Sequence, residues 1–217
     1  MMSLQNQKYI QGLTLIEVII TVLVVAIGML GMAALQVKTL TSTQESYARS
    51  QAVALLEDAS GRIRANREFF ATDPASSPAV DADGNPIDLA NPYTNNLTSG
   101  SFYQWCEVTG APYEPIGTCT GACSARDLAM ADIDLVCSGL NDTGIQGAQI
   151  GVACTDRDVG DSDNCSSGSK LTLYVAWPQI EREDSGDKQI TGTRCQSDIP
   201  TDLVGDGHSC VIIELIP

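Results

Sequence analysis

Eight cysteines are the residues of this chain with the clearest chemistry, which is either disulfide formation or metal binding. All of them lie in the second half of the 217-residue sequence: Cys106, Cys119, Cys123, Cys137, Cys154, Cys165, Cys195 and Cys210. An even number confined to one region favours disulfides formed in an oxidising compartment. Cys154 with Cys165, and Cys195 with Cys210, flank turn-rich stretches and are two pairings that the spacing allows. Other connectivities stay open, so all eight are disulfide candidates.

A zinc site and an enzyme active site both find little support. Cys119 and Cys123 have the spacing of one zinc-ligand pair, but no second pair is as closely spaced and His208 is the only histidine. No Ser, Cys or Asp motif places a nucleophile beside a base. An acidic loop could hold a cation loosely but lacks calcium-loop spacing: Asp156, Asp158, Asp161 and Asp163. We therefore expect no metal, no cofactor and no catalytic residue.

Charge and length restrict the function further. The 12 Lys and Arg against 27 Asp and Glu give a formal net charge of −15, which opposes binding to nucleic acid. The stretch after residue 70 is long enough for one compact domain with its own core. We expect a single acidic head that binds no DNA or RNA.

The elements that must carry these cysteines begin with an apolar segment at 13–37, LTLIEVIITVLVVAIGMLGMAALQV. It is longer than the roughly 20 residues needed to cross a bilayer. Its one charged residue, Glu17, would cost roughly 2.5–3.5 kcal/mol in the middle of a membrane, so it needs a partner or a position at headgroup depth. The alternative is a secretory signal peptide, cleaved after the small residues around Gly31-Met32-Ala33 so that the mature chain starts near Ala34.

The sequence from Gly12 to Val18, GLTLIEV, resembles the prepilin cleavage motif. In that family a peptidase cuts after the Gly and methylates the new amine. The resemblance implies cleavage between Gly12 and Leu13, N-methylation of Leu13, and a role for Glu17 in assembly. A new cationic N-terminus is a natural partner for the Glu17 carboxylate of a neighbouring subunit in a low-dielectric helix bundle.

Downstream, apolar residues recur every three or four positions up to residue 66 and predict an amphipathic continuation of the same helix. A second helix is expected at 124–140, with Ser124 and Asp127 at capping-box spacing. Strands are expected at 101–108, 147–154, 170–177 and 209–216, and turn signals predict a long loop at 72–100. The order predicts an α+β fold in which the long helix packs on an antiparallel sheet, which is the layout of type IV pilins.

The expected organisation is a leader peptide at 1–12, a transmembrane or filament-core helix at 13–37, an amphipathic stalk helix at 38–70 and a disulfide-rich periplasmic head at 71–217. The segments Arg49–Ala52, Arg62–Asn66 and Asp127–Ala129 with Asp132 resemble PilV-type minor pilins. That resemblance implies a subunit that helps to prime pilus assembly near the tip. It also implies as partners the prepilin peptidase, other minor and major pilins, a tip adhesin and, before assembly, inner-membrane lipid. A minor pseudopilin of a type II secretion system is the alternative, because it shares the same N-terminal design.

Overall fold

The computed structural model describes residues 14–67, 91–94, 102–158, 160, 165, 168–178, 199, 201–204 and 208–217. The chain divides into two compact units, Met1–Gln44 and Glu45–Pro217. Most of the predicted loop at 72–100 lies outside the described residues.

One long helix, α1 (Leu15–Ala65), supplies residues to both units. The predicted long helix is confirmed and runs from Leu15 to Ala65, close to the expected 13 to 66. Residues 68–70 of the expected stalk segment lie outside the described residues. Its large apolar side chains from Leu15 to Leu40 are exposed, and residues 15–37 alone rise by about 35 Å, more than the roughly 30 Å of a bilayer's hydrocarbon core. Among the described residues, α1 is the one helix long and apolar enough to cross a membrane.

The head contains a four-stranded antiparallel sheet, and all four predicted strands are present. They are β1 (Phe102–Glu107), β2 (Gln149–Thr155), β3 (Lys170–Pro178) and β4 (His208–Leu215), and they lie in the order β1-β2-β3-β4. The second predicted helix is α3 (Ala125–Asp142), which begins with the expected capping box of Ser124 and Asp127. A single-turn helix, α5 (Thr201–Val204), was not predicted.

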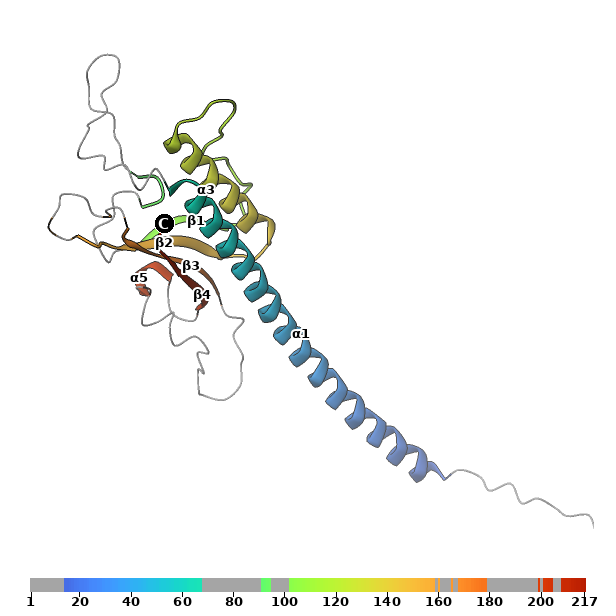
Figure 1. Cartoon of the computed structure of the whole chain (residues 1–217). Helices are drawn as coiled ribbons and strands as arrows, with labels where there is room; N and C mark the ends of the chain where they lie inside the picture. The colour runs from blue at the N-terminus through green and yellow to red at the C-terminus, as the bar shows by residue number, and fades with distance from the viewer. Residues whose placement is uncertain are drawn as a thin grey trace, which may run out of the picture. The chain divides into compact units, whose positions relative to one another are not determined.

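The main core lies between one face of this sheet, the second half of α1 and α3 (Figure 1). Strand β3 alternates as its sequence predicts, with one set of side chains in this core: Leu171, Leu173, Val175 and Trp177. Residues of α1 recur on the same face at helical spacing: Ala48, Ala52, Leu56, Ala59 and Ile63. The type IV pilin arrangement expected from the sequence, a long helix on an antiparallel sheet with disulfides, is therefore confirmed.

A bulge in β1 turns the ring of Trp105 into the core. Gln104 pairs with Gly151 and Cys106 pairs with Ile150, so Trp105 is the extra residue between them. Such a bulge lets two successive residues turn toward one side of a strand. Trp105 is buried and Cys106 packs against the same core, and the bulge thereby brings Cys106 within reach of α3.

The opposite face of the sheet carries a smaller core around Tyr174, with Ala176, Ile199 and Val204. Tyr174 lies across from Gly151 in the β2–β3 register. A side chain at position 151 would clash with the Tyr103 carbonyl oxygen and come within 2.7 Å of the Tyr174 hydroxyl, so glycine leaves room for both the neighbouring strand and the ring. The hydroxyl is buried and has no hydrogen-bond partner within the described part of the chain. Burial raises the pKa of Tyr174.

The Tyr174→Phe variant tests this burial. The pKa of Tyr174 is higher in the folded protein than in the unfolded chain. Its contribution to the free energy of unfolding is therefore fully present below the unfolded tyrosine pKa of about 10, and it is lost as the pH rises through the folded-state pKa. We expect Tyr174→Phe and the parent protein to have the same free energy of unfolding at about pH 7. At about pH 11 the variant should lose less of this free energy than the parent, because phenylalanine does not ionise. Guanidinium unfolding of the detergent-solubilised chain, followed by circular dichroism, measures both. A loss above about 1 kcal/mol at neutral pH would show that the hydroxyl has a partner.

Candidate assembly site

Glu17 lies in the first turn of α1. Its backbone N–H donates to the Thr14 carbonyl oxygen at 3.0 Å, and its carboxylate stands at the positive end of the helix dipole. Thr21, one turn further on, donates its hydroxyl to the Val18 carbonyl at 2.9 Å and is thus satisfied within the helix. Among the residues that the structure describes, none forms an ion pair or side-chain hydrogen bond with Glu17.

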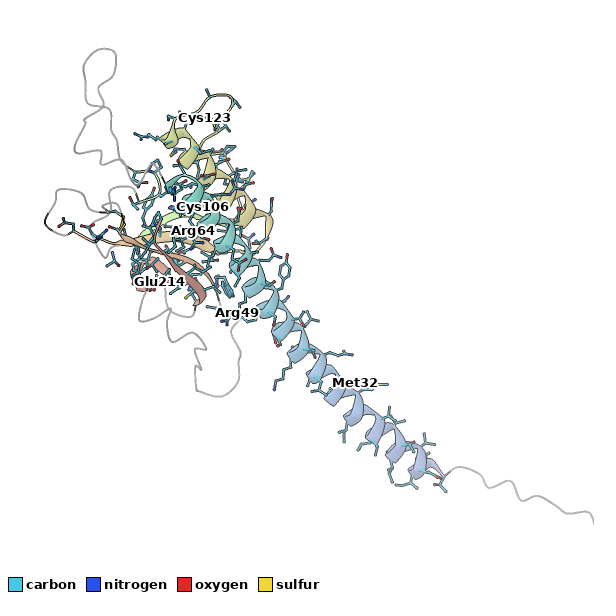
Figure 2. All side chains as sticks on the ribbon, viewed as in Figure 1. Met32, Arg49, Arg64, Cys106, Cys123 and Glu214 are labelled. Carbon is cyan, nitrogen blue, oxygen red and sulfur yellow. A yellow bond between two sulfur atoms is a disulfide. The ribbon has the colours of Figure 1, made fainter. Side chains whose placement is uncertain are left out.

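The surface around Glu17 is apolar and exposed on all sides of the helix. Ile16 is 63 % exposed and Ile20 is 55 % exposed, and the same pattern continues past Met32 (Figure 2). A surface of this kind is stable in lipid or among similar helices rather than in water. It offers a lateral packing surface with a single negative charge near its start.

Gly12 and Leu13 lie outside the described residues, which begin at Thr14 on this side of the chain. Cleavage between them and methylation of Leu13 therefore stay predictions. The same holds for the leader at 1–12.

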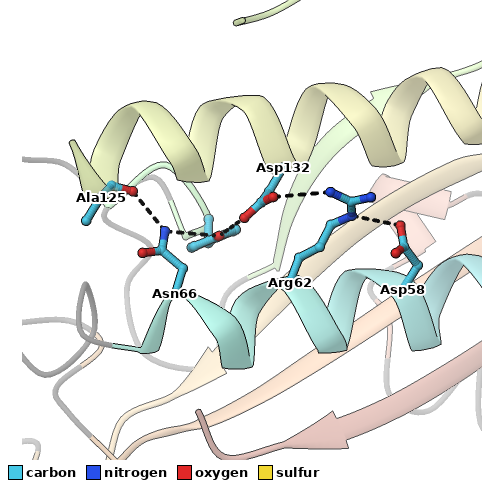
Figure 3. Close-up of polar contacts among 6 residues, drawn as sticks. Asp58, Arg62, Asn66, Ala125 and Asp132 are labelled. Atoms are coloured by element: carbon cyan, nitrogen blue, oxygen red, sulfur yellow. Dashed lines mark hydrogen bonds and ion pairs between the residues drawn. The ribbon is translucent and has the colours of Figure 1, made fainter. Parts of the chain in front are cut away.

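A second polar site lies inside the head, where the end of α1 meets α3 (Figure 3). The Arg62 guanidinium contacts two carboxylates: Nε lies 2.8 Å from Asp58 Oδ2, and Nη1 lies 3.3 Å from Asp132 Oδ1. The hydrogen bond to Asp58 raises the pKa of Arg62. Asp132 comes from α3 and is buried, so this contact joins the two helices.

Tyr93 completes the network from the segment 91–94. Its hydroxyl donates to Asp132 Oδ2 at 2.7 Å, and its carbonyl accepts from Trp105 Nε1 at 2.8 Å. Asn66, at the end of α1, donates to the Ala125 carbonyl at 2.8 Å. Burial raises the pKa of Tyr93. Two helices, a strand and a loop segment are thus held by one set of polar contacts, which we call the Arg62–Asp132–Tyr93 network.

The sequence did not predict this network. Arg62 lies in the last turn of α1, and no prediction from the sequence pairs it with Asp58 and Asp132. The missed signal is Asp132, which lies on the apolar face of α3 between Ala129 and Val136. A carboxylate at a buried position requires a partner, and Tyr93 is a partner that no sequence spacing identifies.

Three disulfides lie wholly within the described residues and pair Cys106 with Cys137, Cys119 with Cys123, and Cys154 with Cys165. Cys210 is also disulfide-bonded, whereas Cys195 lies outside the described residues, so its pairing stays a prediction. A zinc site at Cys119 and Cys123 would need free thiolates, but the two cysteines are disulfide-bonded to each other. The described residues also contain no group of three or more potential metal ligands.

In the part of the chain that the structure describes, His208 and the acidic loop form no further group of potential ligands. His208, the only histidine, is the first residue of β4 and lies opposite Pro178. In the acidic loop, Asp156 Oδ1 accepts a hydrogen bond from the Ser169 hydroxyl at 3.0 Å. Asp161 and Asp163 lie outside the described residues.

Asp132→Ala tests the network. The change removes the acceptor of the buried Tyr93 hydroxyl and one partner of Arg62, so we expect a loss of about 1–3 kcal/mol in the free energy of unfolding. Asp58→Ala is the control, because this half-exposed partner of the same arginine contributes at most about 1 kcal/mol. Guanidinium unfolding of the full chain in detergent compares them. Equal losses would show that the network does not stabilise the junction.

Two family models match adjoining parts of the chain. The prokaryotic N-terminal methylation motif matches residues 7–33, and the type IV pilin Tt1218-like family matches residues 34–81. The first match includes Gly12, Leu13 and Glu17. No curated protein and no solved structure matches the chain significantly. The two matches, the apolar N-terminal helix and the four-stranded antiparallel sheet with its disulfides together support a type IV pilin.

Proposed function

We propose that this chain is a minor pilin that helps to start the assembly of a type IV pilus, in a complex near the tip. Before assembly, α1 anchors it in the inner membrane with the head in the periplasm. Its role is structural rather than enzymatic. The exposed apolar surface of α1 and the disulfides of the head support this proposal, because disulfides form in oxidising compartments.

Glu17 is the observation that carries the mechanism. It is a carboxylate on an apolar helix, and it has no partner among the described residues. Cleavage by the prepilin peptidase between Gly12 and Leu13 creates an amine that stays cationic when methylated. In a low-dielectric bundle of helices, the amine of one subunit and Glu17 of the next attract each other, and an unpaired Glu17 is costly. The pairing sets the register of the incoming subunit.

A minor role near the tip is supported by the sequence resemblance to PilV-type subunits. Residues that carry it, Arg62, Asn66 and Asp132, lie together in the Arg62–Asp132–Tyr93 network. A minor pseudopilin of a type II secretion system would use the same peptidase and the same Glu17. The two assignments differ in the filament that contains the subunit.

The mature N-terminus tests processing first. We expect mass spectrometry of the protein from membranes to find a methylated peptide that starts at Leu13, because the motif places the cleaved bond directly after Gly12. A start near Ala34 would make the protein a secreted soluble domain and would end the assembly proposal. An uncleaved chain that begins at Met1 would remove the amine from the mechanism.

Glu17→Ala tests assembly separately from processing. We expect normal cleavage but an at least tenfold lower amount in sheared pili, as for the loss of about 1.4 kcal/mol of interaction. Thr21→Val is the matched control, since the Thr21 hydroxyl bonds within its own helix.

The outcomes of this experiment separate the alternatives. Normal incorporation of the Glu17 variant would remove Glu17 from the mechanism. Deletion of the whole chain distinguishes the two filaments: a loss of pili with normal secretion supports the minor pilin, whereas a secretion defect with normal pili supports the pseudopilin.

A further inference from the structure

The disulfide between Cys119 and Cys123 closes a small loop on the surface of the head. The two cysteines have a sequence separation of 4. Their neighbours Thr118, Thr120 and Ala122 are all exposed, and both cysteines are half-buried. Cys123 stands in the loop that leads into α3 (Figure 2). Solvent and a second molecule can therefore approach this bridge.

The other two described bridges lie in a different environment. Cys137 is 2 % exposed, Cys154 is 0 % exposed and Cys165 is 9 % exposed, and all three belong to the main core. Cys106 packs against the same core. A thiolate must reach a sulfur atom along the S–S axis to exchange with it, and core packing obstructs that approach.

The local fold around the Cys119–Cys123 bridge has other supports. Ser124 Oγ accepts the Asp127 N–H at 3.1 Å, and Asp127 Oδ2 accepts the Ser124 N–H at 3.2 Å, so α3 is capped without the bridge. The preceding loop is held by Asp134, which accepts the Tyr113 hydroxyl at 2.7 Å and the Ile116 N–H at 2.6 Å. A disulfide that closes so short a loop also restricts the unfolded chain least.

We propose that Cys119–Cys123 is a thiol–disulfide exchange site, which a dithiol can reduce and a disulfide can restore while the head stays folded. The partner is a dithiol protein that presents two cysteines in one accessible loop. One of its thiolates attacks a sulfur of the bridge, the S–S bond breaks, and a mixed disulfide forms. Its second thiol then attacks that mixed disulfide. Two electrons and two protons pass to Cys119 and Cys123, and the partner becomes oxidised.

Graded reduction of the full chain in detergent tests the proposal, with dithiothreitol as the dithiol. Free thiols are alkylated with iodoacetamide at each step, and mass spectrometry identifies the modified peptides. We expect Cys119 and Cys123 to be modified at a dithiothreitol concentration at least about tenfold lower than Cys137 and Cys154. Circular dichroism is expected to stay unchanged over this first step. Modification of Cys137 or Cys154 at the same or a lower concentration, or unfolding during the first step, would overturn the proposal.

Two paired variants serve as controls. In Cys119→Ser/Cys123→Ser, the spectrum and the unfolding midpoint should stay close to those of the parent, and oxidised thioredoxin should no longer be produced when reduced thioredoxin is added. Cys106→Ser/Cys137→Ser, which opens a bridge of sequence separation 31 in the core, should lower the midpoint clearly. Thioredoxin oxidation by the first variant at the parent's rate would show that another disulfide exchanges.

Discussion

Close packing of the second half of α1 against the sheet and α3 is the constraint on which the head depends. The contact stripe combines three small residues, Ala48, Ala52 and Ala59, with two fully buried large ones, Leu56 and Ile63. Small side chains let the helix axis approach the sheet, and each large one contributes about 1.5–3 kcal/mol by its burial. Gly139 likewise allows α3 to approach α1 closely, because a side chain at this position would come within 2.9 Å of Leu55 Cδ2.

The Arg62–Asp132–Tyr93 network adds polar contacts between α1 and α3 to this apolar packing. A buried carboxylate such as Asp132 is costly when it loses its partners, so the network disfavours arrangements that separate them. Trp105 extends the constraint to the sheet through its hydrogen bond to the Tyr93 carbonyl. The Cys106–Cys137 disulfide joins the same strand to the same helix. Covalent and polar restraints therefore converge on the junction of α1, α3 and β1.

The helix α1 serves two environments with one continuous backbone. Up to Leu40 its large apolar side chains are exposed, whereas from Ala48 its apolar side chains are buried in the head on one stripe. Glu17 belongs to the first segment and Arg62 to the second. The difference in their partners follows from this division: Arg62 is paired within the chain, and the partner that we propose for Glu17 belongs to another subunit.

The sequence by itself determined the elements of this protein, because helix and strand periodicity are local properties of the chain. It predicted the long helix, the capping box at Ser124 and the four strands of the sheet, though not α5, and the motif around Glu17 agrees with the match to the N-terminal methylation motif. The tertiary structure decided what depends on distant residues. The pairing of Cys106 with Cys137, the hydrogen bond from Trp105 to Tyr93 and the hydrogen bond from Tyr93 to Asp132 bring together positions 12 to 39 residues apart. Such contacts arise only when the sheet and both helices pack around one core, so no local pattern encodes them.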